Sequence, residues 1–346
     1  MARKLLFASL AFGPVTILVH YAAHPGSNLD FVLSAAALVP LAWLIGEATE
    51  HAAHHTGPGI GGFLNATFGN APELIIALFA VSDGLFEVVR GSLTGSVIGN
   101  LLLVLGFSLI FGGRGALDRR STFVSLGLVA LAALLFLVPA VPALDGDPER
   151  DAIAELSIAP SVVLLLVYLV VTYLSLRRHR LLHVSDEAPE MAGWSFPLSL
   201  VVLGAATAVT AVIAEILVGS LEHFAESAGL TDFFVAAVIV AIVGNAAEHG
   251  GAVVVAARGQ IRLAAEIALA SSAQVAVFLV PAVALLAWAI EPLALSFRAV
   301  ELGMLGLSVV VAAVLLLDGR SSRLRGAALV AAYAGVVVAF FLAGDR

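Results

Sequence analysis

The sequence predicts an all-α polytopic membrane protein with eleven transmembrane helices, arranged as one leading helix and two inverted repeats of five helices each. Three observations predict this fold: the apolar composition, the positions of the basic residues, and a short acidic motif that occurs twice in apolar surroundings. Membrane lipid is therefore the first expected partner of this chain.

The composition is that of a protein whose solvent is lipid. Apolar residues make up 61% of the 346 residues and charged residues only 12%, and the mean hydropathy is +1.06, whereas about a quarter of the residues in a soluble domain are charged. The net charge of −8 argues against nucleic acid as a partner, because no basic run offsets it. The absence of cysteine excludes disulfides, thiolate metal sites and cysteine nucleophiles.

Eleven apolar segments are long enough to cross a bilayer, which takes about 20 mostly apolar residues. They are separated by clusters of glycine, proline and charged residues. The predicted spans are 5–21, 31–49, 62–81, 93–111, 122–141, 158–176, 196–218, 233–256, 263–288, 297–317 and 324–342.

The basic residues predict the orientation of these spans. If the N-terminus is cytoplasmic, every Lys and Arg falls in a cytoplasmic segment except Arg90, Arg150, Arg298 and Arg346. Cytoplasmic loops are expected to carry this excess of positive charge, and adding or removing an internal span would destroy the alternation. We therefore expect a cytoplasmic N-terminus and an outside C-terminus. The short loops and the lack of appended domains favour a prokaryotic plasma membrane.

Residues 1–26 allow a second interpretation. A basic start followed by an apolar run is also typical of a signal peptide. The run is long for the hydrophobic region of such a peptide, which favours a retained first span.

Two copies of Gly-Asn-Ala-x-Glu form the clearest internal repeat. FGNAPELIIALF starts at Phe68 and VGNAAEHGGAVV at Val243, which places Glu73 and Glu248 175 residues apart. The predicted units are a leading helix (1–24), a first five-helix repeat (25–176), a linker (177–194) and a second five-helix repeat (195–346). Because five is odd, the halves must insert in opposite senses. Inverted repeats are typical of secondary transporters, whose sites lie near the bilayer midplane at the repeat interface.

The linker is basic at its start and acidic at 185–190. A solvated cytoplasmic loop and a segment that regulates transport by sensing cations both fit this pattern.

A glutamate inside each apolar repeat marks the candidate site, because ionisable residues within membrane spans are rare and are functional by default. In each copy an asparagine lies three residues before the glutamate, a spacing that puts amide and carboxylate on one helix face. The two pairs are Asn70 with Glu73 and Asn245 with Glu248.

Each copy also contains residues that loosen a helix. Gly69 and Gly244 permit close helix approach or a local break. Pro72 has no N–H, so within a helix the carbonyl of Phe68 loses its donor. Such a carbonyl is tolerated at membrane depth only where protein or a polar cavity receives it. The motif therefore offers carboxylate, amide and carbonyl oxygens.

These oxygens are hard ligands. A hard cation such as Ca²⁺ takes about six to eight of them, and a site rich in carboxylate and free of cysteine disfavours soft metals. The spans that follow each motif add neutral donors suited to complete or orient a coordination shell. These donors are Ser96, Asn100, Ser271, Ser272 and Gln274.

The pair of acids also predicts a second transported ion. Two carboxylates facing each other in a low-dielectric cavity repel, and burial favours their neutral forms. Either one divalent cation or two protons would neutralise the pair, and the site has the same formal charge in both cases. A site that is neutral with either ion bound, and costly when empty, is suited to exchange one ion for the other, as an antiporter does. His249, beside Glu248, can titrate near neutral pH and could tune this competition; a structural histidine is the alternative.

The doubled motif, with NLLLVLG and SSAQVAVF after its copies, resembles the α-repeats of the CAX branch of the cation/Ca²⁺ exchangers, and the resemblance covers nearly the whole chain. It implies an eleven-span Ca²⁺/H⁺ antiporter with an acidic stretch between its repeats, matching 185–190. It also implies Glu73 and Glu248 as central carboxylates, with Asn70, Asn245, Ser96 and Gln274 nearby. Sodium-coupled relatives carry a Gly-Thr-Ser type sequence where this chain has Gly-Asn-Ala, which favours protons as the second ion.

The resemblance further suggests a pathway role for acids outside the motif. Glu50, in GEATEH, and Glu215, in VIAEILVGS, resemble family positions thought to serve the ion or proton pathway. Glu47 lies three residues before Glu50 and shares its helix face. Solvated helix ends are the alternative for all three.

Other functions fit the sequence less well. His51 and His55 have the i, i+4 spacing of zinc-binding helices, with His54 between them, which keeps Zn²⁺ transport and a membrane metallohydrolase as alternatives. A cytoplasmic entrance for ions, or a polar end of the second span, fits this cluster better. Mn²⁺ transport is a further alternative for the ion choice. Two further alternatives are an exchanger coupled to Na⁺ and a cation channel. A channel does not need two inverted five-helix repeats, so the repeats favour an exchanger. No enzyme activity and no resident cofactor are expected, because no nucleophile or phosphate-loop motif is present; Ca²⁺ and H⁺ are the transported ions. A homo-oligomer is compatible with the sequence.

Overall fold

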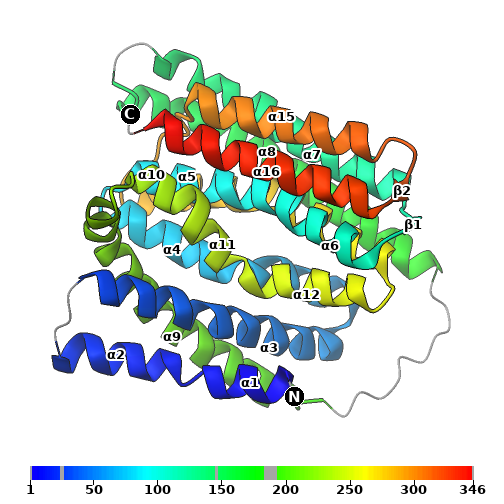
Figure 1. Ribbon diagram of the computed structural model, residues 1–346, viewed down its shortest axis with the longest axis horizontal. Helices are drawn as coiled ribbons and strands as arrows, with labels where there is room; N and C mark the ends of the chain where they lie inside the picture. Colours follow the sequence, from blue (N-terminus) through cyan, green and yellow to red (C-terminus); the bar gives the residue numbers. More distant parts are fainter. Residues whose placement is uncertain (1, 24–26, 145–146, 183–192, 345–346) are drawn as a thin grey trace.

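The computed structural model describes residues 2–23, 27–144, 147–182 and 193–344, and for 2–5, 23, 27, 57–63, 65–66, 175–182 and 247–248 it describes the backbone only. The chain is almost entirely helical, as predicted (Figure 1). The α-helices are α1 (Ala2–Ser9), α2 (Phe12–Ala23), α3 (Ser27–Gly69), α4 (Ala71–Ser82), α5 (Phe86–Ile98), α6 (Leu105–Gly112), α7 (Arg119–Ala140), α8 (Asp151–Leu182), α9 (Phe196–Ala228), α10 (Asp232–Phe234), α11 (Ala241–Gly244), α12 (Ala246–Ala257), α13 (Ile261–Gln274), α14 (Val280–Leu286), α15 (Ala299–Leu315) and α16 (Arg323–Ala343).

Several helices contain segments of different winding. Three are π-helical: η1 (Gly99–Val104), η3 (Val235–Val240) and η4 (Val275–Leu279). Two are 3₁₀ turns: η2 (Pro142–Leu144) and η5 (Ala287–Ala289). The two strands, β1 (Gly115–Ala116) and β2 (Arg320–Ser321), form a short antiparallel pair that joins two loops. This pair was not predicted from the sequence.

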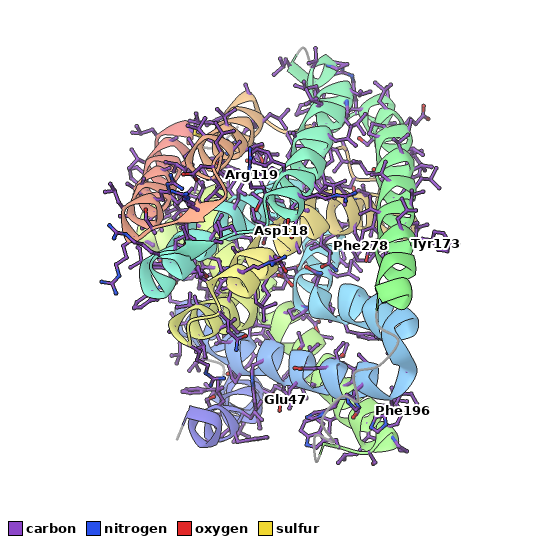
Figure 2. All side chains as sticks on the ribbon, turned by 90° about the vertical axis from the view of Figure 1, so that its right-hand side faces the viewer. Glu47, Asp118, Arg119, Tyr173, Phe196 and Phe278 are labelled. Carbon is purple, nitrogen blue, oxygen red and sulfur yellow. The ribbon has the colours of Figure 1, made fainter. Side chains whose placement is uncertain are left out.

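In the part of the chain that the structure describes, seven helices are long and apolar enough to cross a membrane, and an eighth span results if the bent pair Asp232–Gly244 and His249–Ala257 is counted as one. Three shorter apolar helices cover Leu6–Ala22, Ala71–Ser82 and Ala299–Leu315. The outer surface of the helices carries many exposed apolar side chains. On α8, for example, Tyr173 points outward and is 63% exposed, whereas Tyr168 packs inward against Phe278 (Figure 2). The chain is therefore an integral membrane protein.

The helices stack in layers across the view of Figure 1. The leading helices α1 and α2 lie with α3 and α9 at the bottom, and α3 packs along α9. The segments α4–α6 and α10–α12 form the middle, and α7, α8, α15 and α16 lie at the top. One large buried apolar cluster extends from α3 to α16. The two motif-bearing segments, α4 and α11–α12, are thus inside the stack.

The loop that the sequence predicted between the second and third spans is absent. We expected a loop between residues 49 and 62, but α3 continues through this region and ends at Gly69. The chain breaks instead at Asn70, inside the predicted third span, with Pro72 in the first turn of α4. Proline is tolerated there because first-turn N–H groups have no intrahelical acceptor. Phe68 is in the last turn of α3, so its carbonyl is one of the terminal carbonyls without a helical donor.

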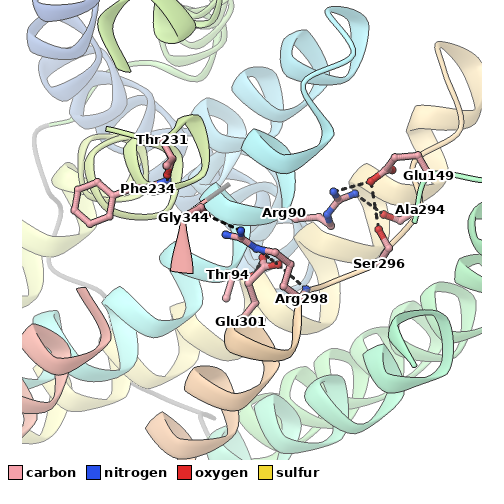
Figure 3. Close-up of polar contacts among 10 residues, drawn as sticks. All are labelled: Arg90, Thr94, Glu149, Thr231, Phe234, Ala294, Ser296, Arg298, Glu301 and Gly344. Carbon is pink, nitrogen blue, oxygen red and sulfur yellow. Dashed lines mark hydrogen bonds and ion pairs between the residues drawn. The ribbon is translucent and has the colours of Figure 1, made fainter. Parts of the chain in front are cut away.

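Arg90 corrects the predicted start of the fourth span. We placed Arg90 in an outside loop and began the span at residue 93, but α5 starts at Phe86 and Arg90 is buried, with 1% of its surface exposed. Its guanidinium lies 2.7 Å from a carboxylate oxygen of Glu149 and donates to the carbonyl of Ala294 at 3.2 Å (Figure 3). A buried charge requires such partners, and they come from distant parts of the sequence.

Around Arg90, buried polar contacts tie the ends of several helices together (Figure 3). Glu301, at the start of α15, accepts from the backbone N–H of Arg298 at 2.7 Å and from the hydroxyl of Thr94 at 3.4 Å. Arg298 also donates to the carbonyl of Gly344 at 2.8 Å, which holds the end of α16. Arg90, Thr94, Glu149, Arg298 and Glu301 together are called the Arg90 cluster.

Replacing Glu149 by glutamine is expected to destabilise the protein, because it leaves the buried Arg90 charge without its counter-ion. The expected loss is about 3 kcal/mol, seen as a midpoint of thermal unfolding several degrees lower in detergent. Glu155→Gln is the matched control, since Glu155 is exposed on the neighbouring helix α8. Equal midpoints for the two variants would contradict the role given to the ion pair.

Candidate functional site

The two asparagines of the repeated motif have the same unusual backbone conformation. Asn70 has φ −99° and ψ 15°, and Asn245 has φ −93° and ψ 4°. Both are 1% exposed, and a new helix starts at the residue after each. This conformation is sparsely populated and is often found at active sites. A local break, one of the two possibilities that Gly69 and Gly244 left open, is therefore present in both copies, at the asparagine itself.

Each break places a glutamate in the first turn of a helix. Glu73 is the third residue of α4, and Glu248 is the third residue of α12. The first turn of a helix carries a partial positive charge that stabilises a carboxylate. The break thus lowers the cost of holding a negative charge inside the membrane.

The first glutamate lies against the second motif. Glu73 is buried, with 8% of its surface exposed. A Cβ atom added to Gly244 would lie 3.2 Å from Cγ of Glu73 and 3.7 Å from its carboxylate carbon. The absence of a side chain at Gly244 therefore allows this close approach. The side chain of Glu248, four residues further on, is outside the described residues.

The second asparagine is held by polar side chains of the first half. Asn245 donates from Nδ2 to the hydroxyl of Ser96 at 2.7 Å and to the carbonyl of Ala241 at 3.0 Å, and its Oδ1 accepts from Nδ2 of Asn100 at 3.3 Å. Asn245, Ser96 and Asn100 are at most 2% exposed. These contacts fix the orientation of the amide inside the protein.

Glu73 and Ser96 line one small cavity. Its other lining residues are Ile76, Ser92, Leu93, Val240 and Ala241. Its volume is about 10 Å³, room for roughly one water molecule. The cavity therefore connects the carboxylate of the first motif to the hydroxyl that binds the asparagine of the second.

The remaining predicted oxygen donors, Ser271, Ser272 and Gln274, lie on α13. Ser272 donates to the carbonyl of Val97 at 2.9 Å, and these residues are separated by the repeat offset of 175. Ser271 is buried at 6% exposure, and Gln274 is half-buried at the end of α13.

The sequence did not predict the π-helical segment that follows in each half: η1 starts at Gly99 and η4 at Val275. Such segments are frequent at functional sites.

The acids outside the motif have different surroundings. The side chains of Glu50 and Glu215 are exposed, on α3 and α9. Glu47 lies 3.6 Å from the ring of His51. Figure 2 shows Glu47 on α3. His249 is half-buried on α12, and its Nε2 has no hydrogen-bond partner within the described part of the chain.

The histidines of α3 contact a residue that follows the linker. The ring of His51 lies 4.9 Å from that of Trp194, and Nε2 of His55 lies 3.0 Å from the carbonyl oxygen of Trp194. Within the described residues no three His, Asp or Glu side chains converge to hold a metal ion, and His51 and His55 each have another partner. The zinc-site alternative thus gains no support. The acidic stretch 185–190 lies outside the described residues.

Two residues near the candidate site, Ser92 and Gly95, were not predicted from the sequence. Ser92 lies one helical turn before Ser96, and this i, i+4 spacing could have placed it on the same face. Gly95 packs directly on η3 at Ala237, and only the small-residue pattern of membrane interfaces hints at such a contact.

The chain is similar to known exchangers over almost its whole length. The model of the family described as sodium/calcium exchanger protein matches residues 29–177 and 198–342. The chain is 37% identical to the Ca²⁺/H⁺ antiporter of Synechocystis sp., over 98% of this chain and 97% of the relative. It is 36% identical to the Ca²⁺/H⁺ antiporter ChaA of Bacillus subtilis, over 98% and 99%.

The fold agrees with these matches. The solved structure of native YfkE has a TM-score of 0.82 and 34% identity to this chain, with 99% of this chain and 100% of that chain covered. A family match of this extent, in two blocks that each contain one copy of the motif, is decisive. The chain belongs to the sodium/calcium exchanger protein family.

Proposed function

We propose that this protein exchanges Ca²⁺ for protons across a membrane by alternating access, with Glu73 and Glu248 as the shared site of both ions. The observation that carries the site is the contact of Glu73 with Gly244, which sets the first glutamate against the motif that contains the second. The relatives named above are Ca²⁺/H⁺ antiporters, and at this identity and coverage we assign the same exchange to this chain.

The chemistry of the surrounding groups supports a hard cation as substrate. The Glu73 carboxylate, the Ser96 hydroxyl and the Asn245 amide supply the oxygen ligands that Ca²⁺ prefers. Phe68, Gly69 and Asn70 at the first break, and Ser271 and Gln274 on α13, remain predicted contributors. Ser96 and Asn100 orient the Asn245 amide in the structure, and such supporting contacts tune the affinity of a metal site.

The two carboxylates explain why the exchange is coupled. A buried dianion is costly, so we infer that the site crosses the membrane either with one Ca²⁺ or with two protons. His249, next to Glu248, and the acids Glu47, Glu50 and Glu215 are proposed to tune or feed this site.

We infer that the architecture is eleven spans in two inverted repeats with the unit boundaries predicted above. The proposal is supported by apolar helices in all eleven predicted segments and by the equal breaks at Asn70 and Asn245. In Figure 1, α10–α12 run from left to right, whereas α4 leads leftward into α5. The positive-inside rule then gives a cytoplasmic N-terminus and an outside C-terminus.

The experiment that tests this function uses inside-out membrane vesicles. With an acidic lumen, Ca²⁺ uptake is expected, and a protonophore should abolish it. Ca²⁺ flux that is independent of the pH gradient would indicate a channel. Uptake that requires a Na⁺ gradient would indicate sodium coupling, and faster uptake of Mn²⁺ or Zn²⁺ than of Ca²⁺ would change the substrate.

A further inference from the structure

The short strands β1 and β2 border a pocket that the proposed exchange does not use. The pair lies at one end of the helical stack, where α6 and α15 end and α7 and α16 begin (Figure 1). The pocket has a volume of about 540 Å³, which is within the usual range of small-molecule sites. Three of its eight lining residues are arginines and one is an acid: Arg114, Arg320, Arg325 and Asp318.

The charges that line the pocket are unbalanced. The carboxylate of Asp318 is held by Arg325, whose Nη2 lies 2.7 Å from Oδ2. Arg114 and Arg320 are exposed, and within the described residues neither is in an ion pair with a carboxylate. The lining therefore has an excess of positive charge. These like charges repel each other, and an anion bound between them removes that cost.

The start of α16 adds hydrogen-bond donors to the pocket. Ser322, a lining residue, is the N-cap of α16, and its hydroxyl accepts from the backbone N–H of Arg325 at 3.3 Å. The other N–H groups of a first helical turn have no acceptor within the helix, and such a helix start attracts phosphate. The guanidinium groups of Arg114 and Arg320 can each offer two parallel N–H groups to phosphate oxygens. The pocket thus has the donors and the charge that a phosphate group requires.

The surroundings of the pocket are basic as well. Figure 2 looks onto this end of the helices, with Asp118 and Arg119 at the start of α7. The Asp118 carboxylate lies 2.7 Å from Nη2 of Arg262, which balances its charge. The side chains of Arg119, Arg120 and Arg323 are exposed, and none of them is ion-paired in the part of the chain that the structure describes. This end of the molecule therefore attracts anionic ligands.

Exposed apolar side chains beside the pocket favour a lipid over a free ion. Leu324, in the first turn of α16, is 81% exposed, Leu317 is 60% exposed, and Phe111, near the end of α6, is 57% exposed. Because α7 and α16 are long and apolar enough to cross a membrane, their first turns mark a membrane surface. A basic pocket bordered by apolar side chains at this level suits a phospholipid, whose phosphate group is joined to acyl chains.

We propose that this pocket binds the phosphate group of an anionic phospholipid, with Arg114 and Arg320 as its main ligands and the exposed apolar side chains against its acyl chains. The inference requires that the chain is a membrane protein, not that it exchanges Ca²⁺. A lipid held there joins the α6–α7 loop to the α15–α16 loop, beside the pairing of β1 with β2. In the orientation proposed above, the pocket faces the cytoplasmic leaflet, where basic pockets between helices bind anionic headgroups.

The test is native mass spectrometry of the purified protein, titrated with dioleoyl phosphatidylglycerol and, separately, with dioleoyl phosphatidylcholine. We expect one phosphatidylglycerol to bind more tightly than further copies of it and more tightly than phosphatidylcholine. Arg114→Gln and Arg320→Gln should each weaken this binding about fivefold, the usual contribution of one basic residue near an anionic lipid surface. The double variant should weaken it roughly 30-fold if the two contributions add.

Arg258→Gln is the matched control, because Arg258 is also exposed, at the end of α12, and is not among the residues that line the pocket. It should change the affinity by less than about twofold, since exposed charges outside the pocket are screened. The replaced arginines are all exposed, so the variants should remain folded, as checked by size-exclusion chromatography.

Three results would overturn the inference. The first is equal binding of phosphatidylcholine, and the second is the same loss of affinity in Arg258→Gln as in the pocket variants. The third is displacement of the phosphatidylglycerol by inorganic phosphate at an equal concentration, which would make the pocket a site for a free anion.

Discussion

Replacing Glu73 by glutamine is expected to abolish Ca²⁺/H⁺ exchange while the protein remains folded in the membrane. Glutamine has the same shape but cannot bind a proton or supply a charged ligand. Since Glu73 is buried against Gly244 and lines a cavity between the two motifs, an exposed acid is not expected to replace it. We expect the rate to fall at least about a hundredfold, as is usual when an essential charged group is removed.

The measurement is Ca²⁺ uptake in vesicles that contain equal amounts of folded protein, checked by size-exclusion chromatography. Glu248→Gln should give the same loss, which would extend the site to a side chain outside the described residues. Glu155→Gln, exposed on α8, should exchange as the wild type does. Normal exchange by either motif variant would refute the assignment of that residue.

The second large effect is expected from Gly95→Ala. A Cβ atom at Gly95 would overlap the carbonyl oxygen of Ala237 and lie 2.7 Å from its carbonyl carbon. The obstacle is backbone, so no side-chain rotation can relieve it, and α5 would have to move away from η3. Overpacking typically costs about 1–3 kcal/mol, and an obstacle made of backbone places this substitution at the upper end of that range. The midpoint of thermal unfolding should therefore fall by several degrees, or little folded protein should be obtained.

Gly127→Ala is the control for this variant. Gly127 lies within α7, and a Cβ atom there meets nothing within 4 Å. The alanine should be neutral or slightly stabilising, because alanine favours a helix by about 1 kcal/mol relative to glycine. If Gly95→Ala unfolds at the temperature of Gly127→Ala, the close packing of α5 on η3 is wrong.

The sequence predicted the helical fold and the residues of the motifs because their signals are local. Hydropathy identifies apolar helices, and the spacing of Asn70 from Glu73 needs only one turn of chain. The start of α5 could not be predicted this way, since Arg90 is buried by virtue of Glu149 and Ala294. The loop predicted between residues 49 and 62 was wrong, because Gly57 and Pro58 are a local loop signal although α3 continues through them.

In the candidate site, too, the sequence predicted single residues but not the contacts between them. Spacing along the chain identified Ser96 and Asn245, but not that one binds the other. That contact depends on how α5 packs against α11, as does the cavity that includes Ser92. The π-helical winding of η1 and η4 was not predicted either, because η4 is an ordinary apolar run and η1 adds only Gly99 and Asn100 to one.

The most direct test of the shared site is calorimetric Ca²⁺ binding to the purified protein at several pH values, in buffers of different ionisation enthalpy. If Ca²⁺ and protons occupy the same two carboxylates, each bound Ca²⁺ should displace close to two protons at acidic pH, because metal ligands must be deprotonated. Glu73→Gln should then lose both the binding and the proton release. Ca²⁺ affinity that is independent of pH, or unchanged in Glu73→Gln, would contradict this account.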